Sequence, residues 1–202
     1  MRPLEKPRVL QLNDGGVVLF PPYIWKFQYD FNYIELKPKI DNLFSLVEKN
    51  SKLEKGDAIS TVSVNQELQP HTWEELAKFQ QWLGATFESI KDTYRFVERQ
   101  SQVTQSWVNR HGFGGITEEH NHNFSTFVVS CYLNCPVNSG NIEFKDPLEY
   151  HFAGWPIEPE EILYKEIPVT TNDVIIFPGW LRHRVQPNRS QENRYVMTFN
   201  IK

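Results

Sequence analysis

Apolar residues recur at helical spacing in the first half of the chain. Four of them follow Pro38 at i, i+3, i+4 and i+7, which predicts a short amphipathic helix from about residue 38 to 50. These four are Ile40, Leu43, Phe44 and Val47. Residues 72–75 then show capping-box spacing before a second apolar face. That face predicts a long helix and consists of Leu76, Phe79, Leu83, Phe87, Ile90 and Tyr94.

In the second half, the apolar period shortens from about 3.6 residues to about 2, which is typical of strands. Candidate strands lie near residues 94–100, 103–109, 125–134, 141–145, 162–169, 173–178 and 194–201. Helices followed by short antiparallel strands predict an α+β, mainly β fold. We expect a double-stranded β-helix (jelly roll) with N-terminal helices packed on one sheet. Residues 1–202 would form a single domain, with a strand and helical support region at 1–93 and the jelly-roll core at 94–202.

Composition and charge narrow the class of protein. The chain has 202 residues, a formal charge of −4 and a pI near 5.9, so we expect no nucleic-acid partner. No stretch approaches the ~20 apolar residues of a membrane span, and the first residues mix Pro with charge where a signal peptide would be apolar. We therefore expect a cytoplasmic protein that does not bind membranes. Nothing in the sequence indicates an oligomeric state.

The two cysteines are not arranged for redox chemistry or zinc. Cys131 and Cys135 match neither a CxxC motif nor a zinc knuckle. On one pleated strand they would point to the same face. We expect them to be buried free thiols of a reducing compartment.

Three histidines form a candidate metal site. His120 and His122 are separated by one residue, so in an extended segment both rings project from the same side. His183 follows an apolar strand that ends in a Pro-Gly turn, and this turn would place His183 at the end of a strand. Imidazole suits Fe, Zn, Cu or Ni, and three protein ligands leave coordination positions open for catalysis. The other histidines (His71, His111 and His151) are predicted to be structural or exposed.

The final strand carries a second candidate group. Alternation places Arg194, Val196, Thr198 and Asn200 on one face and four apolar residues on the other. A polar face headed by a guanidinium fits a ligand-filled barrel interior, where Arg can bind a carboxylate through two parallel hydrogen bonds. Tyr132, on the strand after the histidine pair, would either donate to that carboxylate or be a core aromatic with a solvated hydroxyl.

In this order, these motifs resemble the 2-oxoglutarate- and Fe(II)-dependent dioxygenases, specifically their prolyl-4-hydroxylase-like branch and nearby putative 2OG-Fe(II) oxygenases. The resemblance runs from about residue 107 to 201 and rests on WVNRHGFGG, HNH, CYLN, SGNIEFKDP, DVIIFPGWLRHRVQPN and RYVMTFN. It implies that His120, His122 and His183 hold Fe(II). It also implies that Arg194, assisted by Tyr132 and Thr198, binds 2-oxoglutarate.

The chain departs from this family at His122, where the family usually has a carboxylate. The site would then be a three-His triad with one less negative charge. His122 is expected to be a ligand, with a supporting or substrate-contacting role as the alternative.

The resemblance implies hydroxylation of a peptidyl or small-molecule substrate with O2, releasing succinate and CO2. Asn109, Trp107 and Trp180 are candidates for contacts with that substrate. Two alternatives stay open. One is a cupin-type three-His dioxygenase that needs no 2-oxoglutarate, and the other is a non-catalytic jelly-roll binding module.

Overall fold

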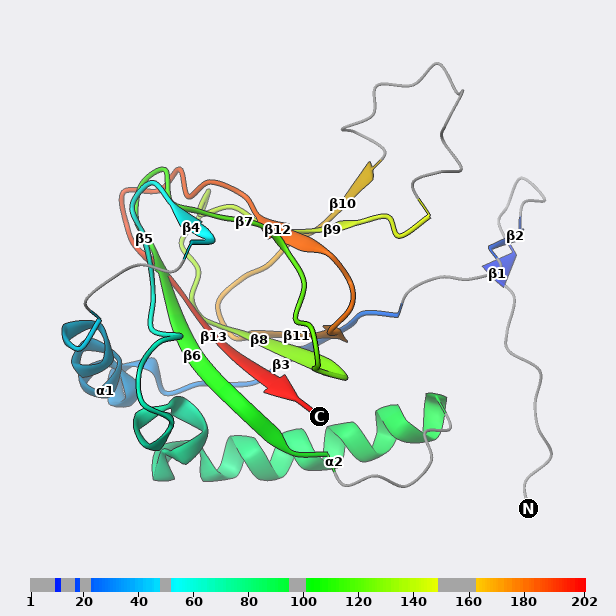
Figure 1. Cartoon of the computed structure of the whole chain (residues 1–202), viewed down its shortest axis with the longest axis horizontal. Helices are drawn as coiled ribbons and strands as arrows, with labels where there is room; N and C mark the ends of the chain where they lie inside the picture. Colours follow the sequence, from blue (N-terminus) through cyan, green and yellow to red (C-terminus); the bar gives the residue numbers. More distant parts are fainter. Residues whose placement is uncertain (1–9, 12–16, 19–22, 48–51, 95–100, 149–162) are drawn as a thin grey trace.

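The computed structural model describes residues 10–11, 17–18, 23–47, 52–94, 101–148 and 163–202 (Figure 1). Two antiparallel sheets face each other as a jelly roll, which confirms the predicted fold class. The major sheet has the order β3 (Trp25–Gln28), β11 (Asp173–Pro178), β8 (Phe127–Asn134), β13 (Arg194–Ile201), β6 (Val103–His111) and β5 (Ala58–Ser60). The minor sheet has the order β10 (Tyr164–Ile167), β9 (Ile142–Lys145), β12 (His183–Val185), β7 (Ile116–His120) and β4 (Glu54–Lys55). A separate pair joins β1 (Leu10–Gln11) to β2 (Val17–Val18).

The major sheet has an apolar outer face and a mixed inner face, as the alternation in β8 and β13 predicts. Met197, Phe199 and Ile201 belong to the core cluster beneath the helices. Val196 and Tyr132 instead join the cluster between the two sheets, together with residues of the minor sheet such as Phe144. The polar face of β13 therefore points into the jelly roll.

Two helices cover the outer face of the major sheet. They are α1 (Tyr33–Ser45) and α2 (Ala77–Tyr94), and α2 lies below the strands of the major sheet in Figure 1. Phe79 of α2 packs its ring 5.0 Å from Phe31 and 5.6 Å from Phe199. The predicted packing of the N-terminal helices on one sheet is thus confirmed. Among the described residues, no helix is both long and apolar enough to cross a lipid bilayer.

The first helix begins earlier than predicted. It starts at Tyr33, because the side chain of Asn32 accepts a hydrogen bond from the backbone N–H of Glu35 and caps the helix. Pro38 consequently lies inside the helix instead of in its first turn. Leu36, which precedes the predicted start, is buried with Ile40 on the same face.

The capping box predicted before the second helix is wrong. The hydroxyl of Thr72 donates to the backbone oxygens of Glu67 and Gln69. Instead of a cap, three short 3-10 helices precede α2: Gln66–Leu68, Pro70–Thr72 and Glu74–Leu76.

Most predicted strands of the jelly roll are present, with shifts of one or two residues at their ends. The strand predicted at 94–100 is not seen, because residue 94 ends α2 and residues 95–100 lie outside the described residues. His151 also lies outside them. Strands β7 and β12 were not predicted, and they carry two of the candidate histidines.

The cysteines are free, but they do not share a face. Cys131 is buried in the cluster under the helices, whereas Cys135 is half-buried beside the inner cluster. Strand β8 ends at Asn134, so the alternation that would align the two thiols stops before Cys135.

Candidate active site

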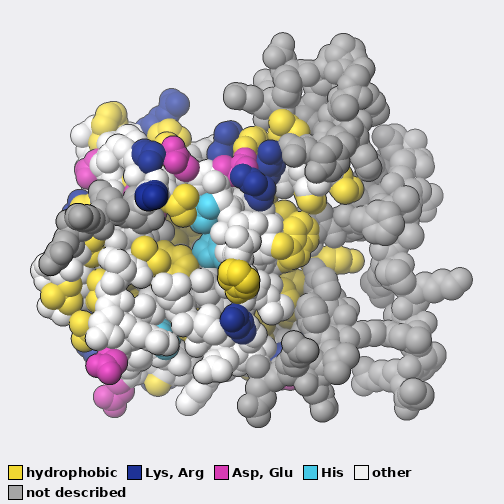
Figure 2. Space-filling view, in the orientation of Figure 1, with side chains coloured by type: hydrophobic (Ala, Val, Ile, Leu, Met, Phe, Trp, Pro, Cys, Tyr) yellow, Lys and Arg dark blue, Asp and Glu magenta, His cyan; other side chains and the backbone are white. Residues whose placement is uncertain are grey.

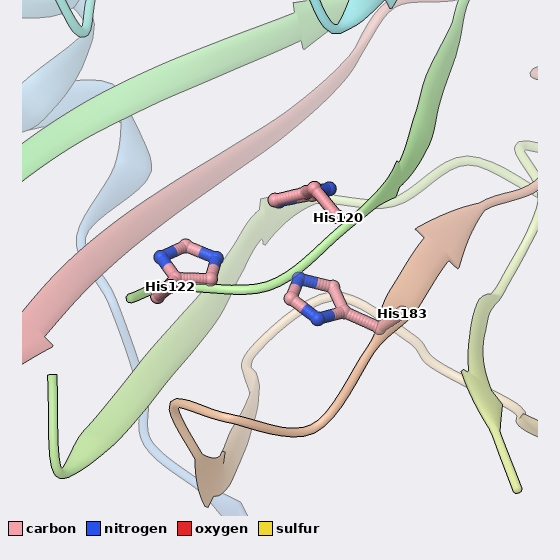
Figure 3. Close-up of side chains that lie close together, drawn as sticks. All are labelled: His120, His122 and His183. Carbon is pink, nitrogen blue, oxygen red and sulfur yellow. The ribbon is translucent and has the colours of Figure 1, made fainter. Parts of the chain in front are cut away.

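The three candidate histidines lie together at one end of the jelly roll. His120 ends β7 and pairs in register with His183, the first residue of β12. His122 follows β7 in a loop, and its backbone N–H donates to the oxygen of Gly179 at 2.8 Å. The ring centroids of His120 and His183 are 4.3 Å apart, and that of His122 lies 5.1 and 5.2 Å from them. Figure 3 shows the three rings gathered around one region.

Each of these imidazoles is anchored through its Nδ1 atom. Nδ1 of His120 lies 2.8 Å from the backbone oxygen of Glu118, and Nδ1 of His183 lies 3.0 Å from that of Leu181. Nδ1 of His122 lies 2.7 Å from the side-chain oxygen of Asn200. A carbonyl oxygen only accepts, so Nδ1 carries the proton and the lone pair of Nε2 is free. One ligand nitrogen from each residue lies within 4.8 Å of the others.

The environment keeps the three rings neutral. Burial lowers the pKa of His120, and burial together with His120 lowers the pKa of His122 to about 4. Burial and the other two histidines hold the pKa of His183 well below its usual range. A neutral imidazole is the form that binds a metal, so this site needs no deprotonation near pH 7.

Aromatic side chains fix the orientation of the rings. Trp107 stacks on His122 with centroids 5.6 Å apart and an interplanar angle of 16°. Phe177 meets His183 edge-on at 4.7 Å. Trp107 is only 7% exposed and covers one side of the His122 ring. Trp180, in the loop before His183, is 54% exposed. In Figure 2, histidine side chains are visible near the centre of the face, close to charged groups of both signs.

Gly179 allows two loops of the site to approach each other closely. Its N–H donates to the oxygen of Thr126 at 3.0 Å, while its own oxygen accepts from His122. A Cβ at this position would lie 2.2 Å from the backbone oxygen of Ser125. Only glycine fits there without a shift, so the Pro-Gly turn positions both His122 and His183.

The candidate co-substrate residues share the inner face of the major sheet. Arg194, Tyr132 and Thr198 are 0%, 2% and 5% exposed, so Arg194 does not lie on an exposed edge. Nη1 of Arg194 donates to the backbone oxygens of Ser139 and, at 2.8 Å, of Gly140. Part of the guanidinium is therefore bound by protein, and the expected two parallel hydrogen bonds to a carboxylate cannot both use Nη1.

Two further residues of this face were given no site role in the sequence. The sequence placed Asn200 on the polar face of the last strand. Its contact with His122 could not be predicted, because the two residues are 78 positions apart in the sequence. His111, predicted to be structural or exposed, is buried opposite Arg194 in the β6–β13 register. Asn109, the third inward residue of β6 beside Trp107 and His111, is half-buried.

Residues 105–200 match the model of a family described as "Putative 2OG-Fe(II) oxygenase". No curated protein sequence matches the chain.

Several solved structures share the fold at low sequence identity. The 2-oxoglutarate-dependent epimerase SnoN from nogalamycin biosynthesis is 11% identical, with a TM-score of 0.63 over 90% of this chain and 78% of that one. A Pseudomonas putida prolyl-4-hydroxylase is 11% identical, with a TM-score of 0.57 over 89% and 92%. HygX from Streptomyces hygroscopicus, with nickel, 2-oxoglutarate and hygromycin B bound, is 12% identical, with a TM-score of 0.58 over 89% and 82%. The family match over residues 105–200, which include the three candidate histidines, and the shared jelly-roll fold thus make this chain similar to the 2-oxoglutarate- and Fe(II)-dependent oxygenases.

Proposed function

We propose that this oxygenase binds Fe(II) through His120, His122 and His183 and hydroxylates a peptidyl or small-molecule substrate at the expense of 2-oxoglutarate. The observation that carries the proposal is the common anchoring of the three rings, because each Nδ1 is hydrogen-bonded and each Nε2 is left for a metal. The similarity to HygX, whose structure contains nickel and 2-oxoglutarate, supports the same pair of ligands here.

The residues present fit iron. Three neutral imidazoles suit Fe(II), and three protein ligands leave open positions for other molecules. When bound there with 2-oxoglutarate, the metal would supply the O2 chemistry that yields succinate, CO2 and a hydroxylated product. In the proposed site, His122 takes the place of the usual carboxylate, so the protein contributes no negative ligand and the anionic co-substrate would provide the compensating charge.

The protein's own contribution is to position the co-substrate and keep the site dry. Arg194 lies at one end of the inner face, and Thr198 lies nearer the histidines, in register with Trp107. Burial raises the pKa of Tyr132, so its hydroxyl keeps its proton and remains a donor. We propose that Arg194, Tyr132 and Thr198 bind 2-oxoglutarate, and that residues 94–202 form the catalytic core.

Substrate contacts are proposed for residues near the mouth of the site. Trp180 is exposed beside the loop that carries His183, and it offers an aromatic surface to an incoming molecule. The side-chain oxygen of Asn109 is buried and has no hydrogen-bond partner among the described residues, so it could accept one only from a molecule that enters the space between the sheets. Trp107 would act through its stacking on His122.

The proposal is tested with Fe(II) and 2-oxoglutarate in the absence of oxygen. We expect the weak visible charge-transfer band of the iron–2-oxoglutarate chelate, and we expect succinate once air is admitted. The Arg194→Ala variant should retain iron but lose affinity for 2-oxoglutarate. A wild-type protein that shows neither the band nor succinate would support a non-catalytic binding module. Turnover of a substrate without 2-oxoglutarate would support the cupin-type alternative.

A further inference from the structure

Two buried polar atoms without hydrogen-bond partners lie on the inner face of the major sheet, away from the three candidate metal ligands. Within the described part of the chain, Nδ1 of His111 and Nε of Arg194 are buried and have no hydrogen-bond partner. The two residues are directly opposite in the β6–β13 register, and they are 1% and 0% exposed. Buried polar groups are rarely left unpaired, so this pair indicates a site for a ligand.

His111 is held rigidly at this position. Its Nε2 atom lies 2.8 Å from the hydroxyl oxygen of Thr117, and its backbone oxygen accepts a hydrogen bond from the side-chain nitrogen of the buried Asn188 at 2.8 Å. Burial and the charge of Arg194 hold the pKa of His111 well below its usual range, so the ring is neutral and carries one proton. A hydroxyl can donate as well as accept, so Thr117 can donate to Nε2 and leave the proton on Nδ1.

The unpaired atoms then have the chemistry of an anion site. Nδ1–H of His111 and Nε–H of Arg194 are both donors, and a carboxylate is an acceptor with two oxygens. His111 lies four residues beyond Trp107 on the same face of β6, and Trp107 stacks on His122, so the pair lies farther along this face than the candidate metal ligands. A dicarboxylate with one end at the metal would direct its other end toward His111.

We propose that His111 is a co-substrate-binding residue, in which Nδ1–H donates together with Nε–H of Arg194 to the distal carboxylate of 2-oxoglutarate. Thr117, whose hydroxyl would donate to Nε2, is the positioning residue that supports this tautomer. The inference rests on the proposed function and deepens it, because it adds selection for the length and the second charge of the oxo acid.

Two substitutions separate this role from a structural one. In His111→Asn, the amide nitrogen can occupy the place of Nδ1, so the donor to the carboxylate is retained. In His111→Gln, the amide group reaches the place of Nε2, so the contact with Thr117 is retained and the Nδ1 donor is lost. The proposal ranks Asn above Gln in affinity for 2-oxoglutarate, whereas a purely structural contact with Thr117 ranks Gln above Asn.

The experiment measures binding of two oxo acids to the iron-loaded protein without oxygen. The acids are 2-oxoglutarate and 2-oxopentanoate, which has the same chain length but no distal carboxylate. We expect His111→Gln to weaken 2-oxoglutarate binding by roughly tenfold or more, the effect of one hydrogen bond to a charged group. Binding of 2-oxopentanoate should stay within about twofold, since a group that contacts only the distal carboxylate does not affect it. The His71→Asn variant, at a histidine bonded to Ser106, is the control and should bind both acids as the wild type does.

Equal weakening of both acids, or a variant order with Gln above Asn, would overturn the role of His111. A wild-type protein that binds neither acid would instead refute the proposed function itself. If the His111 variants do not fold, Thr117→Val provides the test. It should lower the affinity for 2-oxoglutarate and not for 2-oxopentanoate, and an unchanged ratio of the two affinities would reject the proposal.

Discussion

The Nδ1 atom of His122 lies 2.7 Å from the side-chain oxygen of Asn200, across the end of the jelly roll. The other two candidate ligands use backbone oxygens for the same purpose, so Asn200 is the one side chain among these three acceptors. Backbone acceptors cannot be removed by substitution, whereas this one can. Of the three candidate ligands, His122 is thus the one whose orientation depends on another side chain.

Replacing Asn200 should weaken metal binding. In Asn200→Ala, the ring of His122 loses its acceptor, and the loss of such an outer partner typically lowers metal affinity by about 10- to 100-fold. In Asn200→Asp, the acceptor oxygen is kept, so the affinity should stay close to that of the wild type. Competition with a chelator measures both variants. Asn134→Ala is the control, because its side chain donates to the backbone oxygen of Asn193, away from the histidines. Equal affinities of Asn200→Ala and the wild type would contradict the assigned tautomer.

Each candidate ligand should be individually required. Single substitutions of His120, His122 or His183 by Ala remove one of three donors, so each should cost more affinity for Fe(II) than the roughly 10- to 100-fold expected for an outer partner. The decisive variant is His122→Ala, since it separates a ligand from a supporting role. Titration calorimetry under nitrogen gives the affinity, with His71→Ala as a control that keeps all three donors. Wild-type affinity in His122→Ala would leave only a two-histidine site.

The alternation of the long strands β8 and β13 could be predicted from the sequence. The two faces of these strands contact different layers, so their residues differ in character. One face meets the helices and carries Met197 and Phe199, and the other meets the minor sheet and carries Val196. The short strands β7 and β12 could not be predicted in the same way. They have five and three residues and contain charged and histidine side chains, so their pairing decides their conformation more than their own pattern does.

For the site, the spacing of His120 and His122 predicted that the two rings lie close together, and the alternation of the last strand predicted that Arg194 and Thr198 face the interior. The register that sets His183 opposite His120 depends on pairing between distant strands, and no local pattern specifies it. The same limit explains why the sequence could not decide between a structural and an exposed His111. Its burial opposite Arg194 follows from the β6–β13 register, and its contact with Thr117 follows from the fold of the loop between β6 and β7.

Acid should destabilise the protein partly through His111. Its pKa is lowered in the folded state from the ordinary value of 6.5, so below pH 6.5 the unfolded chain takes up a proton that the native ring does not. Its contribution to stability is therefore complete above pH 6.5 and is lost as the pH falls toward the folded pKa. The slope is at most about 1.4 kcal/mol per pH unit for one group.

Denaturant unfolding of the metal-free protein at pH 7 and pH 5 measures this effect. The His111→Asn variant has no group titrating at this position, so its free energy of unfolding should decrease less between the two pH values than that of the wild type. The expected difference is about 1–2 kcal/mol. Parallel pH profiles for the two proteins would mean that His111 is protonated equally in the folded and unfolded states.

Substitution of Gly179 should damage both stability and the metal site. In Gly179→Ala, the added methyl group would lie 2.2 Å from the backbone oxygen of Ser125 and 3.0 Å from that of His122, so the two loops must separate. Overpacking of this kind costs about 1–3 kcal/mol. The loop that moves carries His122, so the affinity for Fe(II) should fall together with the melting temperature.

The matched control is Gly84→Ala in helix α2, where a Cβ meets nothing within 4 Å. That variant should keep its metal affinity and gain up to about 1 kcal/mol, because Ala is the better helix former. If Gly179→Ala lost stability but bound Fe(II) as tightly as Gly84→Ala, the close approach of the two loops would have no part in positioning His122.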